Sequence, residues 1–267
     1  MHKQLIESAA ELIKKGSVAA FCGSGVSRES GVPVFRGREG LWEKYDPNLY
    51  VTEEGILSRL LHFPQDFRDF IVELYGALLQ AKPGYSHYSL RELEIKRLLT
   101  GIITQNIDDL HFQAGSREVV EIHGNAYAFI CRGCGVFNKR SRADWLNFVA
   151  NISRISGRID IIREVLRFAG KCPSCDRRLE SSIVLFGQHL PEETVRKSYE
   201  ILNKSGVLLC VGTSGVVYPA ASFPAYAKQR GAKVVNVNPA ASRLDDIADI
   251  NCRMKAGEFF SALDEFL

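Results

Sequence analysis

The sequence predicts an α/β protein with a doubly wound parallel sheet and a smaller second domain. Short runs rich in Val, Ile and Leu show no polar alternation, as expected of strands buried on both faces. These runs cover residues 17–22, 98–104, 119–123, 182–186, 206–212 and 232–238. Helical patterns lie between them, at residues 86–97, 191–204 and around 219–230. Strands that alternate with helices in this way favour a parallel sheet.

Two regions interrupt this alternation and predict the smaller domain. Residues 34–90 are helical and rich in aromatic side chains, whereas residues 124–181 carry two Cys-x-x-Cys pairs and two further helical patterns. We therefore predict a large domain made of residues 1–33, 91–123 and 182–267. The small domain would combine a helical module, residues 34–90, with a zinc-binding module, residues 124–181.

Composition and charge are those of an ordinary soluble globular protein. Of the 267 residues 46% are apolar and 24% charged, and the net charge of +3 is too small to argue for a nucleic-acid or acidic membrane partner. No stretch approaches the roughly 18 apolar residues of a membrane span. The N-terminal residues form an amphipathic helical pattern and not a signal peptide. We expect a cytoplasmic protein (nuclear if the host is eukaryotic) that binds neither membrane nor nucleic acid directly; no oligomeric state is indicated.

Four of the seven cysteines form two Cys-x-x-Cys pairs, a pattern that predicts a structural zinc site. Each pair can place two thiolates on one tetrahedral ion, and four thiolates leave no position open for a water molecule. The 37 residues between the pairs, 135–171, exceed the roughly 15–20 of a compact ribbon. The predicted ligands are Cys131, Cys134, Cys172 and Cys175. The other three cysteines lie in apolar settings and are expected to be buried, unreactive thiols: Cys22, Cys210 and Cys252.

Small and polar residues follow several of the predicted strands. The first strand runs into Gly23-Ser24-Gly25-Val26-Ser27, a turn whose backbone N–H groups could approach a phosphate. It fails the G-x-G-x-x-G test because Arg28 takes the third glycine position, so a plain tight turn is an equal reading. Similar residues follow three later runs: Gln105, Asn106 and Asp108; Gly212, Thr213 and Ser214; Asn236 and Asn238. Local capping would also explain Gln105, Asn106 and Asp108, but strand ends that converge on one sheet edge favour a single binding cleft.

His123 is the candidate general base. It closes the run 119–123 and is followed by Gly124, which leaves room beside the imidazole. A lone histidine is more often structural than catalytic. Its place at a strand end, like the polar residues above, favours the catalytic reading.

Taken in order, these segments resemble the sirtuin family over residues 8–264. The segments are GSGVSRESGVPVFRG with GLW, TQNIDDLH, HGN, the paired Cys-x-x-Cys, VLFG, GTSGVVYPAA and VNVNP. The resemblance implies a Rossmann-like NAD-binding domain, a small domain with one structural zinc, and NAD as a co-substrate. It also implies acyl-lysine protein substrates that enter a cleft between the domains.

The resemblance also implies roles for individual residues. His123, Asn106 and Asp108 would be catalytic, with Asn106 and Asp108 gripping the nicotinamide amide. Further NAD contacts would come from Gly23, Ser24, Gly25, Ser27, Phe35, Arg36, Trp42, Gln105, Ile107, Gly212, Thr213, Ser214, Asn236, Val237, Asn238 and Ala256. The peptide would add as a strand beside Val184, Phe186 and Gly187.

The implied reaction uses no catalytic metal and no protein nucleophile. The substrate amide oxygen attacks the ribose carbon that bears nicotinamide, and exclusion of water helps this step. His123 then takes a proton from the ribose hydroxyls, and the products are lysine, nicotinamide and O-acyl-ADP-ribose.

The sequence departs from the family pattern at four positions near the implied site. Ser24 replaces an alanine, a small change. Val34 stands where Asp or Thr is typical, which would remove a loop hydrogen bond. Gln188 replaces a glutamate and removes a charge that anchors its loop, and Gly215 replaces a leucine and would loosen the adenosine loop. None of these is the inferred base or the Asn/Asp pair, so we expect activity to survive.

Acyl preference follows from a fifth comparison. Sirtuins that favour acidic acyl groups carry a Tyr-x-x-Arg pair, and the matching stretch here is Tyr75-Gly76-Ala77-Leu78. Without the arginine an acidic acyl group lacks its bidentate partner, which favours neutral acyl groups.

Two other functions remain open at the level of sequence. ADP-ribosyl transfer or NAD hydrolysis would use the same residues. A non-enzymatic protein could instead bind a partner through the arginines of its zinc-binding module, although scattered arginines are more often a solvated face. A hydride-transferring dehydrogenase is disfavoured by the missing third glycine.

Overall fold

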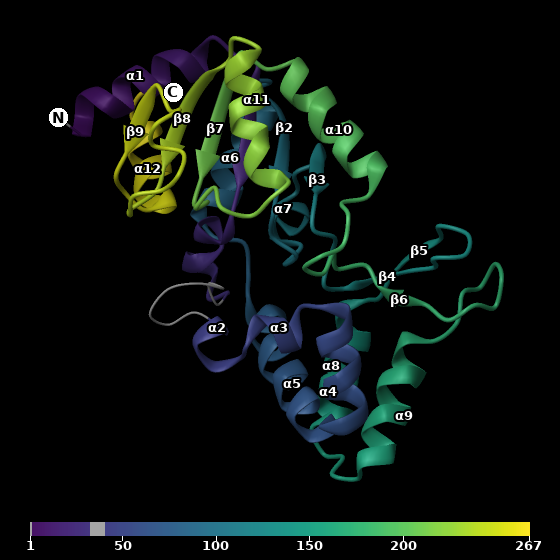
Figure 1. Ribbon diagram of the computed structural model, residues 1–267. Helices are drawn as coiled ribbons and strands as arrows, with labels where there is room; N and C mark the ends of the chain where they lie inside the picture. Colours follow the sequence, from purple (N-terminus) through teal and green to yellow (C-terminus); the bar gives the residue numbers. More distant parts are fainter. Residues whose placement is uncertain (1, 33–40) are drawn as a thin grey trace. The chain divides into compact units, whose positions relative to one another are not determined.

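The computed structural model describes residues 2–32 and 41–267, which form two compact units (Figure 1). Unit 1 takes the chain up to Val32, Lys82–His123 and Leu190–Leu267, and unit 2 takes residues 41–81 and Gly124–His189. The sequence placed residues 82–90 in the helical module and 182–189 in the large domain. The structure differs because Leu90 packs into the core of unit 1, whereas Phe186 is hydrogen-bonded to Val51 of unit 2.

Unit 1 is built on a parallel sheet of six strands in the order β3-β2-β1-β7-β8-β9. The strands are β1 Val18–Cys22, β2 Leu99–Thr104, β3 Val119–Glu121, β7 Val207–Val211, β8 Lys233–Val237 and β9 Ile250–Cys252. Counted along the chain, this is the 3-2-1-4-5-6 order of a doubly wound sheet. The order reverses between β1 and β7, and ligands bind at such a switch point in open α/β sheets. The predicted fold class is confirmed.

Helices cover both faces of this sheet, and the alternating side chains of β1 show how. Val18, Ala20 and Cys22 pack in one core cluster with α1 His2–Lys14, α6 Tyr85–Ile95 and α12 Ala256–Leu263. Ala19 and Phe21 pack on the opposite face with α10 Glu192–Asn203 and α11 Phe223–Gln229. Burial on both faces explains the unbroken apolar runs in the sequence. Short elements complete the unit: η1 Ser24–Val26, η2 Arg28–Ser30, α7 Leu110–Gln113 and η3 Ala220–Ser222.

Unit 2 combines helices with a small antiparallel sheet in the order β5-β4-β6. Its strands are β4 Ala128–Ile130, β5 Phe137–Lys139 and β6 Glu180–Ser181. Its helices are α2 Leu41–Lys44, α3 Pro47–Tyr50, α4 Glu53–His62, α5 Pro64–Gln80, α8 Arg142–Ile152 and α9 Arg158–Ala169. A capping box between Ser141 and Asp144 begins α8. Trp145 of α8 then stacks on Tyr75 of α5, with ring centroids 4.0 Å apart, and this contact joins the two helices.

Two sequence predictions about strands were wrong. Residues 182–186 form no strand beyond an isolated bridge between Thr52 and Phe186. Their side chains are only half-buried or exposed, so the apolar run does not reflect a place inside a sheet. The strand β9 was missed because its INC sequence is short and partly polar.

The described helices include none that is long and apolar enough to cross a membrane.

Candidate active site

The loops after β1 and β7 pack backbone against backbone in unit 1. Gly25 N–H donates to the carbonyl oxygen of Gly212 over 2.9 Å. A Cβ on Gly25 would lie 2.5 Å from Gly212 Cα, and one on Gly23 would lie 2.7 Å from Gly212 O. Gly212 also has φ +63, a left-handed conformation that favours glycine. The glycines of this turn are therefore needed for loop packing. The turn leads into the 3-10 helix η1 and not directly into an α-helix.

Thr213 links the loops that follow β2, β7 and β8. Gln105 Nε2 donates to Thr213 Oγ1 over 2.8 Å, and Asn238 Nδ2 donates to the Thr213 carbonyl oxygen over 2.8 Å. Ser214 beside it is exposed. Three of the strand ends singled out in the sequence are thus joined by hydrogen bonds at the carboxyl edge of the sheet.

Asn236 has different surroundings from Asn238. Its side chain is 1% exposed, and its Nδ2 donates to Asp245 Oδ1 and Asn251 Oδ1. The amide nitrogen of Asn236 is therefore used in hydrogen bonds within the interior of unit 1. Val237 is buried in the core, and Ala256 is the first residue of α12, so the side chains of both are packed in the same cluster. Ile107 is half-buried.

Asn106, Ser27 and Asp108 form a buried hydrogen-bonded chain. Asn106 Nδ2 donates to the Gly23 carbonyl oxygen over 3.2 Å and to Ser27 Oγ over 2.9 Å. Because a carbonyl only accepts, this fixes the orientation of the amide and leaves Asn106 Oδ1 free to accept. Ser27 Oγ in turn donates to Asp108 Oδ2 over 2.6 Å. Burial raises the pKa of Asp108, and the bonds from Ser27 and the Leu110 N–H oppose that shift.

Two buried histidines, His87 and His111, lie next to this hydrogen-bonded chain, and neither was predicted as a site residue. His87 Nδ1 accepts from Gly84 N–H, so in the neutral ring Nε2 carries the proton and faces Ser27 Oγ at 3.4 Å. The His111 ring lies 4.8 Å from that of His87, and its nitrogens have no partner among the described residues. Burial lowers the pKa of His87 to about 4 and that of His111 well below its ordinary value. His111 closes the TQNIDDLH segment, which was the sequence signal for it, whereas His87 had no comparable signal.

His123 lies in the turn that follows β3, two residues past the last strand residue, Glu121. Its Nδ1 lies 3.0 Å from the carbonyl oxygen of Gln105. Because that oxygen can only accept, Nδ1 carries a proton and the neutral ring keeps a lone pair on Nε2. Burial lowers the pKa of His123, and the bond to Gln105 opposes this. The imidazole is therefore neutral near pH 7, as a proton acceptor must be.

In unit 2, residues 185–188 make a tight turn beside α4. Phe186 N–H donates to the Val51 carbonyl oxygen over 2.7 Å, and Gly187 has φ +87. Phe186 is 42% exposed, and Val184 is half-buried. The charge expected at position 188 is absent, but Gln188 still anchors this turn through the hydrogen bonds of its amide to Leu185 and Glu53.

The structure also shows the surroundings of Gly215 and Tyr75. Gly215 has φ +66, and a Cβ there would lie 2.8 Å from Leu244 Cδ2. Leu244 fills the space beside Gly215, so the loop is packed and not loosened. Tyr75 donates its hydroxyl proton to the Ala126 carbonyl oxygen over 2.8 Å, which commits it inside unit 2.

The remaining residues implied for the mobile cofactor loop are only partly described. Phe35, Arg36 and Val34 lie outside the described residues, and Trp42 lies in α2.

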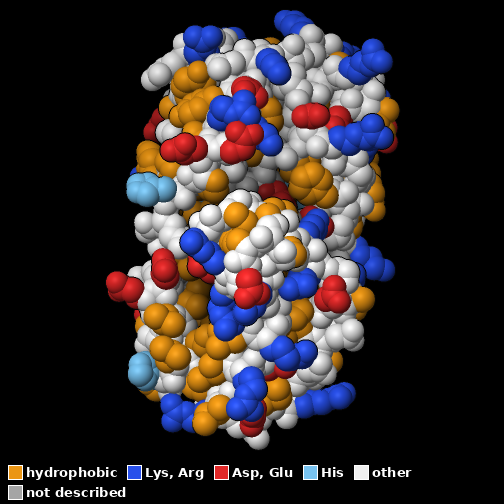
Figure 2. Space-filling model, turned by 90° about the vertical axis from the view of Figure 1, so that its right-hand side faces the viewer, with side chains coloured by type: hydrophobic (Ala, Val, Ile, Leu, Met, Phe, Trp, Pro, Cys, Tyr) orange, Lys and Arg blue, Asp and Glu red, His pale blue; other side chains and the backbone are white. Residues whose placement is uncertain are grey.

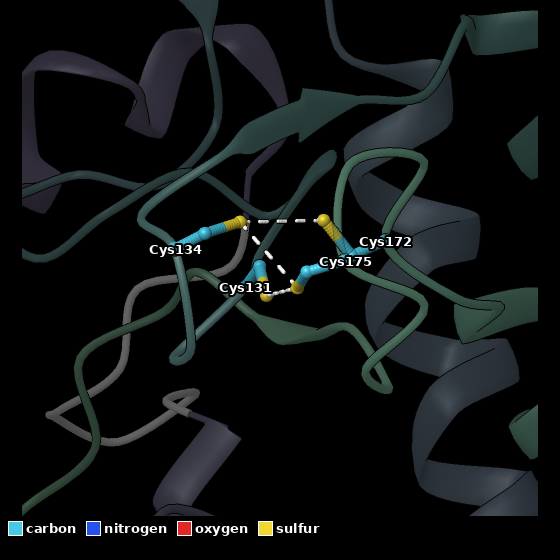
Figure 3. A group of neighbouring side chains, drawn as sticks. All are labelled: Cys131, Cys134, Cys172 and Cys175. Carbon is cyan, nitrogen blue, oxygen red and sulfur yellow. Dashed lines mark hydrogen bonds between the residues drawn. The ribbon is translucent and has the colours of Figure 1, made fainter.

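The four paired cysteines come together in unit 2 (Figure 3). Their sulfur atoms all lie within 4.8 Å of one another, with Cys131 and Cys175 Sγ atoms 3.4 Å apart. Four sulfurs at about 2.3 Å from a tetrahedral ion are about 3.8 Å from each other. The cluster therefore fits one zinc ion. The other cysteines, Cys22, Cys210 and Cys252, are buried, and burial raises the pKa of all three thiols.

The arginines of unit 2 are largely engaged within their own unit. Arg132 pairs with Glu180, Arg140 donates to the Ala169 carbonyl oxygen and Arg158 to that of His62. On α9, Arg163 and Arg167 pair with acidic residues one turn away. Figure 2 shows basic and acidic side chains interspersed over the face that it draws. These are the features of a solvated, charge-paired surface.

The sequence and the fold of this chain are similar to those of proteins of one known family. The sequence profile of the Sir2 family matches residues 23–219. A protein of Thermococcus kodakarensis named NAD-dependent protein deacylase is 40% identical over 97% of this chain and 94% of its own length. A protein of the same name from Pyrococcus abyssi is 37% identical over 95% and 94%. Among solved structures, one described as a Sir2 homolog–NAD complex has a TM-score of 0.78 and 31% identity, covering 97% of this chain and 93% of that one. A Sir2–p53 peptide–NAD⁺ structure has a TM-score of 0.75 and 29% identity, covering 97% and 96%. The chain belongs to the Sir2 family.

Proposed function

We propose that the protein is an NAD-dependent protein-lysine deacylase that releases nicotinamide and O-acyl-ADP-ribose, with His123 as the general base. The observation that carries the proposal is the bond from His123 Nδ1 to the Gln105 carbonyl oxygen. It holds the ring on the strand-end residue Gln105 and leaves the lone pair of the neutral imidazole on Nε2. The relatives named as deacylases and the Sir2 structures with NAD support the same reaction.

The donor and acceptor groups of unit 1 fit NAD. Gly23 and Gly25 lie at the switch point of the sheet, where a pyrophosphate would bind beside the turn. Their own N–H groups already donate to the carbonyl oxygens of Val211 and Gly212. Asn106 Oδ1 is left to accept from the carboxamide of nicotinamide, together with Asp108. Ser24, Ser27, Gln105, Ser214 and Asn238 would complete the contacts. When bound, NAD supplies the electrophilic ribose carbon and the nicotinamide leaving group.

Residues of this chain would bind and orient the two substrates and accept a proton. Asn106 and Asp108 would hold the carboxamide so that the leaving group has one orientation. His123 Nε2 would accept a proton from a ribose hydroxyl, while its Nδ1–H stays on Gln105. Phe186 and its neighbours Val184 and Gly187 would border the acyl-lysine peptide. The four cysteines would hold a structural zinc with no coordination position left for chemistry.

Neutral acyl groups should be preferred over acidic ones. The matching stretch lacks an arginine, and Tyr75 already donates its hydroxyl proton to a backbone carbonyl. A succinyl carboxylate would therefore meet neither partner of a bidentate site there. Comparing kcat/KM for acetyl and succinyl forms of one peptide tests this; equal values would refute it.

Product analysis tests the reaction class. Incubation of the protein with NAD and an acetyl-lysine peptide should give O-acetyl-ADP-ribose, deacetylated peptide and nicotinamide in equal amounts, detectable by mass spectrometry. Transfer of label from NAD to protein without O-acetyl-ADP-ribose would support ADP-ribosyl transfer instead.

A further inference from the structure

The turn of residues 185–188 is closed by both the backbone and the side chain of Gln188. Gln188 N–H donates to the Leu185 carbonyl oxygen over 3.1 Å, as in a β-turn. Gln188 Oε1 accepts from Leu185 N–H over 3.0 Å. Gly187 occupies the position with positive φ, at +87. Residue 188 thus sets the shape of the segment that carries Phe186.

The same side chain ties the turn to α4. Because Leu185 N–H can only donate, the atom facing it is Oε1, and this directs Nε2 away from Leu185. Gln188 Nε2 donates to Glu53 Oε2 over 3.2 Å. Glu53 is the first residue of α4, a place where a carboxylate is favoured by the helix dipole.

The segment on the α4 side is itself well fixed. Thr52 Oγ1 caps α4 by accepting from Gly55 N–H over 3.1 Å and donates to the Asn48 carbonyl oxygen over 2.6 Å. A Cβ on Gly55 would lie 2.3 Å from that same carbonyl oxygen, so the backbone here is closely packed. The bond from Phe186 N–H to Val51 O then joins the turn to this segment. The turn therefore has two ties to a rigid helix start, one through backbone and one through Gln188.

We propose that Gln188 and Glu53 form a matched positioning pair that holds the turn in the shape that receives the acyl-lysine peptide. The proposal rests on the peptide-binding role given above to Val184, Phe186 and Gly187. A glutamate at position 188 could still accept from Leu185 N–H, but its second oxygen would face the Glu53 carboxylate. One of the two positions must therefore carry an amide, and in this chain that position is 188.

A charge-swap series tests the pair with side chains of nearly equal size. The variants are Q188E, E53Q and the double variant E53Q/Q188E, each assayed for kcat and for KM of an acetyl-lysine peptide and of NAD. Q188E should raise the peptide KM about two- to fivefold, the range of exposed charge interactions, with kcat and the NAD KM unchanged. E53Q should match the wild type because the new amide oxygen still accepts from Gln188. The double variant should also match it because the amide then at position 53 can donate to the carboxylate then at position 188.

Salt and direct binding separate the alternatives. The Q188E defect should shrink at high ionic strength, since it arises from charge repulsion. A peptide KM in Q188E equal to that of the wild type, or a double variant as impaired as Q188E, would overturn the pair. A lower Tm of Q188E with unchanged peptide KM would mean that Gln188 only stabilises the fold, and this would also overturn the proposal. Titration of the peptide into each variant measures Kd and needs no turnover. If the Kd values rank the variants as expected for KM but no nicotinamide is released, the pair is upheld and the proposed reaction is refuted.

Discussion

At the scale of single residues, the tautomer of His123 is the most informative feature. The sequence could indicate this histidine only by its place after an apolar run. The proton on Nδ1 follows from Gln105, whose carbonyl lies 18 positions away in sequence and comes near only in the folded sheet. A contact of this kind has no signal in composition or periodicity.

Loss of the base gives the first prediction. His123→Ala should lower kcat for deacylation about 10²- to 10⁴-fold, the usual contribution of a general base. The fold should remain, because the ring lies in a turn and not in a core cluster; circular dichroism and Tm would verify this. His62→Ala changes an exposed histidine at the C-terminal end of α4, outside the proposed machinery, and serves as the control, with unchanged kcat. Near-normal deacylation by His123→Ala would remove His123 from the mechanism.

The buried histidines give a pH-dependent prediction. Their folded pKa values lie below the ordinary value of about 6.5, so the unfolded chain binds protons that the folded chain does not. The stability that these neutral histidines contribute is therefore fully present above pH 6.5. It is lost as the pH falls toward about 4, the pKa of His87. The free energy of unfolding should fall by about 2 kcal/mol through His87 between pH 7.5 and pH 5, and His111 should lower it further.

Urea unfolding at these two pH values measures the effect. His87→Gln should reduce the difference between them, whereas His62→Gln, on the helix end of unit 2, should leave it unchanged. An equal pH dependence in His87→Gln and the wild type would contradict the assignment.

At the scale of elements, the strands β1, β2, β7 and β8 of unit 1 were predictable because both faces of each are buried. The runs 98–104 and 206–212 coincide closely with β2 and β7. The run 182–186 has the same composition but lies in unit 2 as a turn, and β9 was missed because two of its three residues are only half-buried. An apolar run in the sequence thus predicts a strand when both faces of the strand are buried. It fails when pairing with segments distant in sequence determines whether a strand forms.

Loop packing at the sheet edge gives a prediction about glycine. Gly25→Ala would place a Cβ against the Gly212 backbone, and neither backbone can yield as a flexible side chain would. We expect unfolding free energy to fall by about 1–3 kcal/mol and the KM for NAD to rise about tenfold or more. Gly206→Ala meets no atom within 4 Å and is the matched control. Unaltered NAD kinetics in Gly25→Ala would show that the two loops are not held as described.

The zinc cluster was predictable in full because ligand spacing within each pair is a local property. Its prediction is one zinc per chain, lost in Cys134→Ser and retained in Cys252→Ser. Chelation should expose unit 2 to proteolysis near residues 131–175, since the metal there contributes to folding. Full zinc content in Cys134→Ser, measured by atomic emission, would exclude that cysteine as a ligand.

At the scale of the whole molecule, the two units divide the work in the proposed reaction. Unit 1 supplies the groups proposed for NAD and the base, and unit 2 supplies the zinc and the turn proposed for the peptide. The boundaries between them were predicted only approximately, because α6 and residues 182–189 belong to the unit they pack against and not to the one their sequence neighbours suggest. The family motifs indicated which residues matter, and the fold supplied the buried histidines and the Gln188–Glu53 pair.

The most direct test of deacylation is the dependence of NAD cleavage on the peptide. Nicotinamide release should be slow with NAD alone, rise strongly when an acetyl-lysine peptide is added, and match the amount of peptide deacetylated. In His123→Ala, formation of deacetylated peptide should fall about 10²-fold or more. Rapid nicotinamide release without any peptide, unchanged when the peptide is added, would contradict the proposed function.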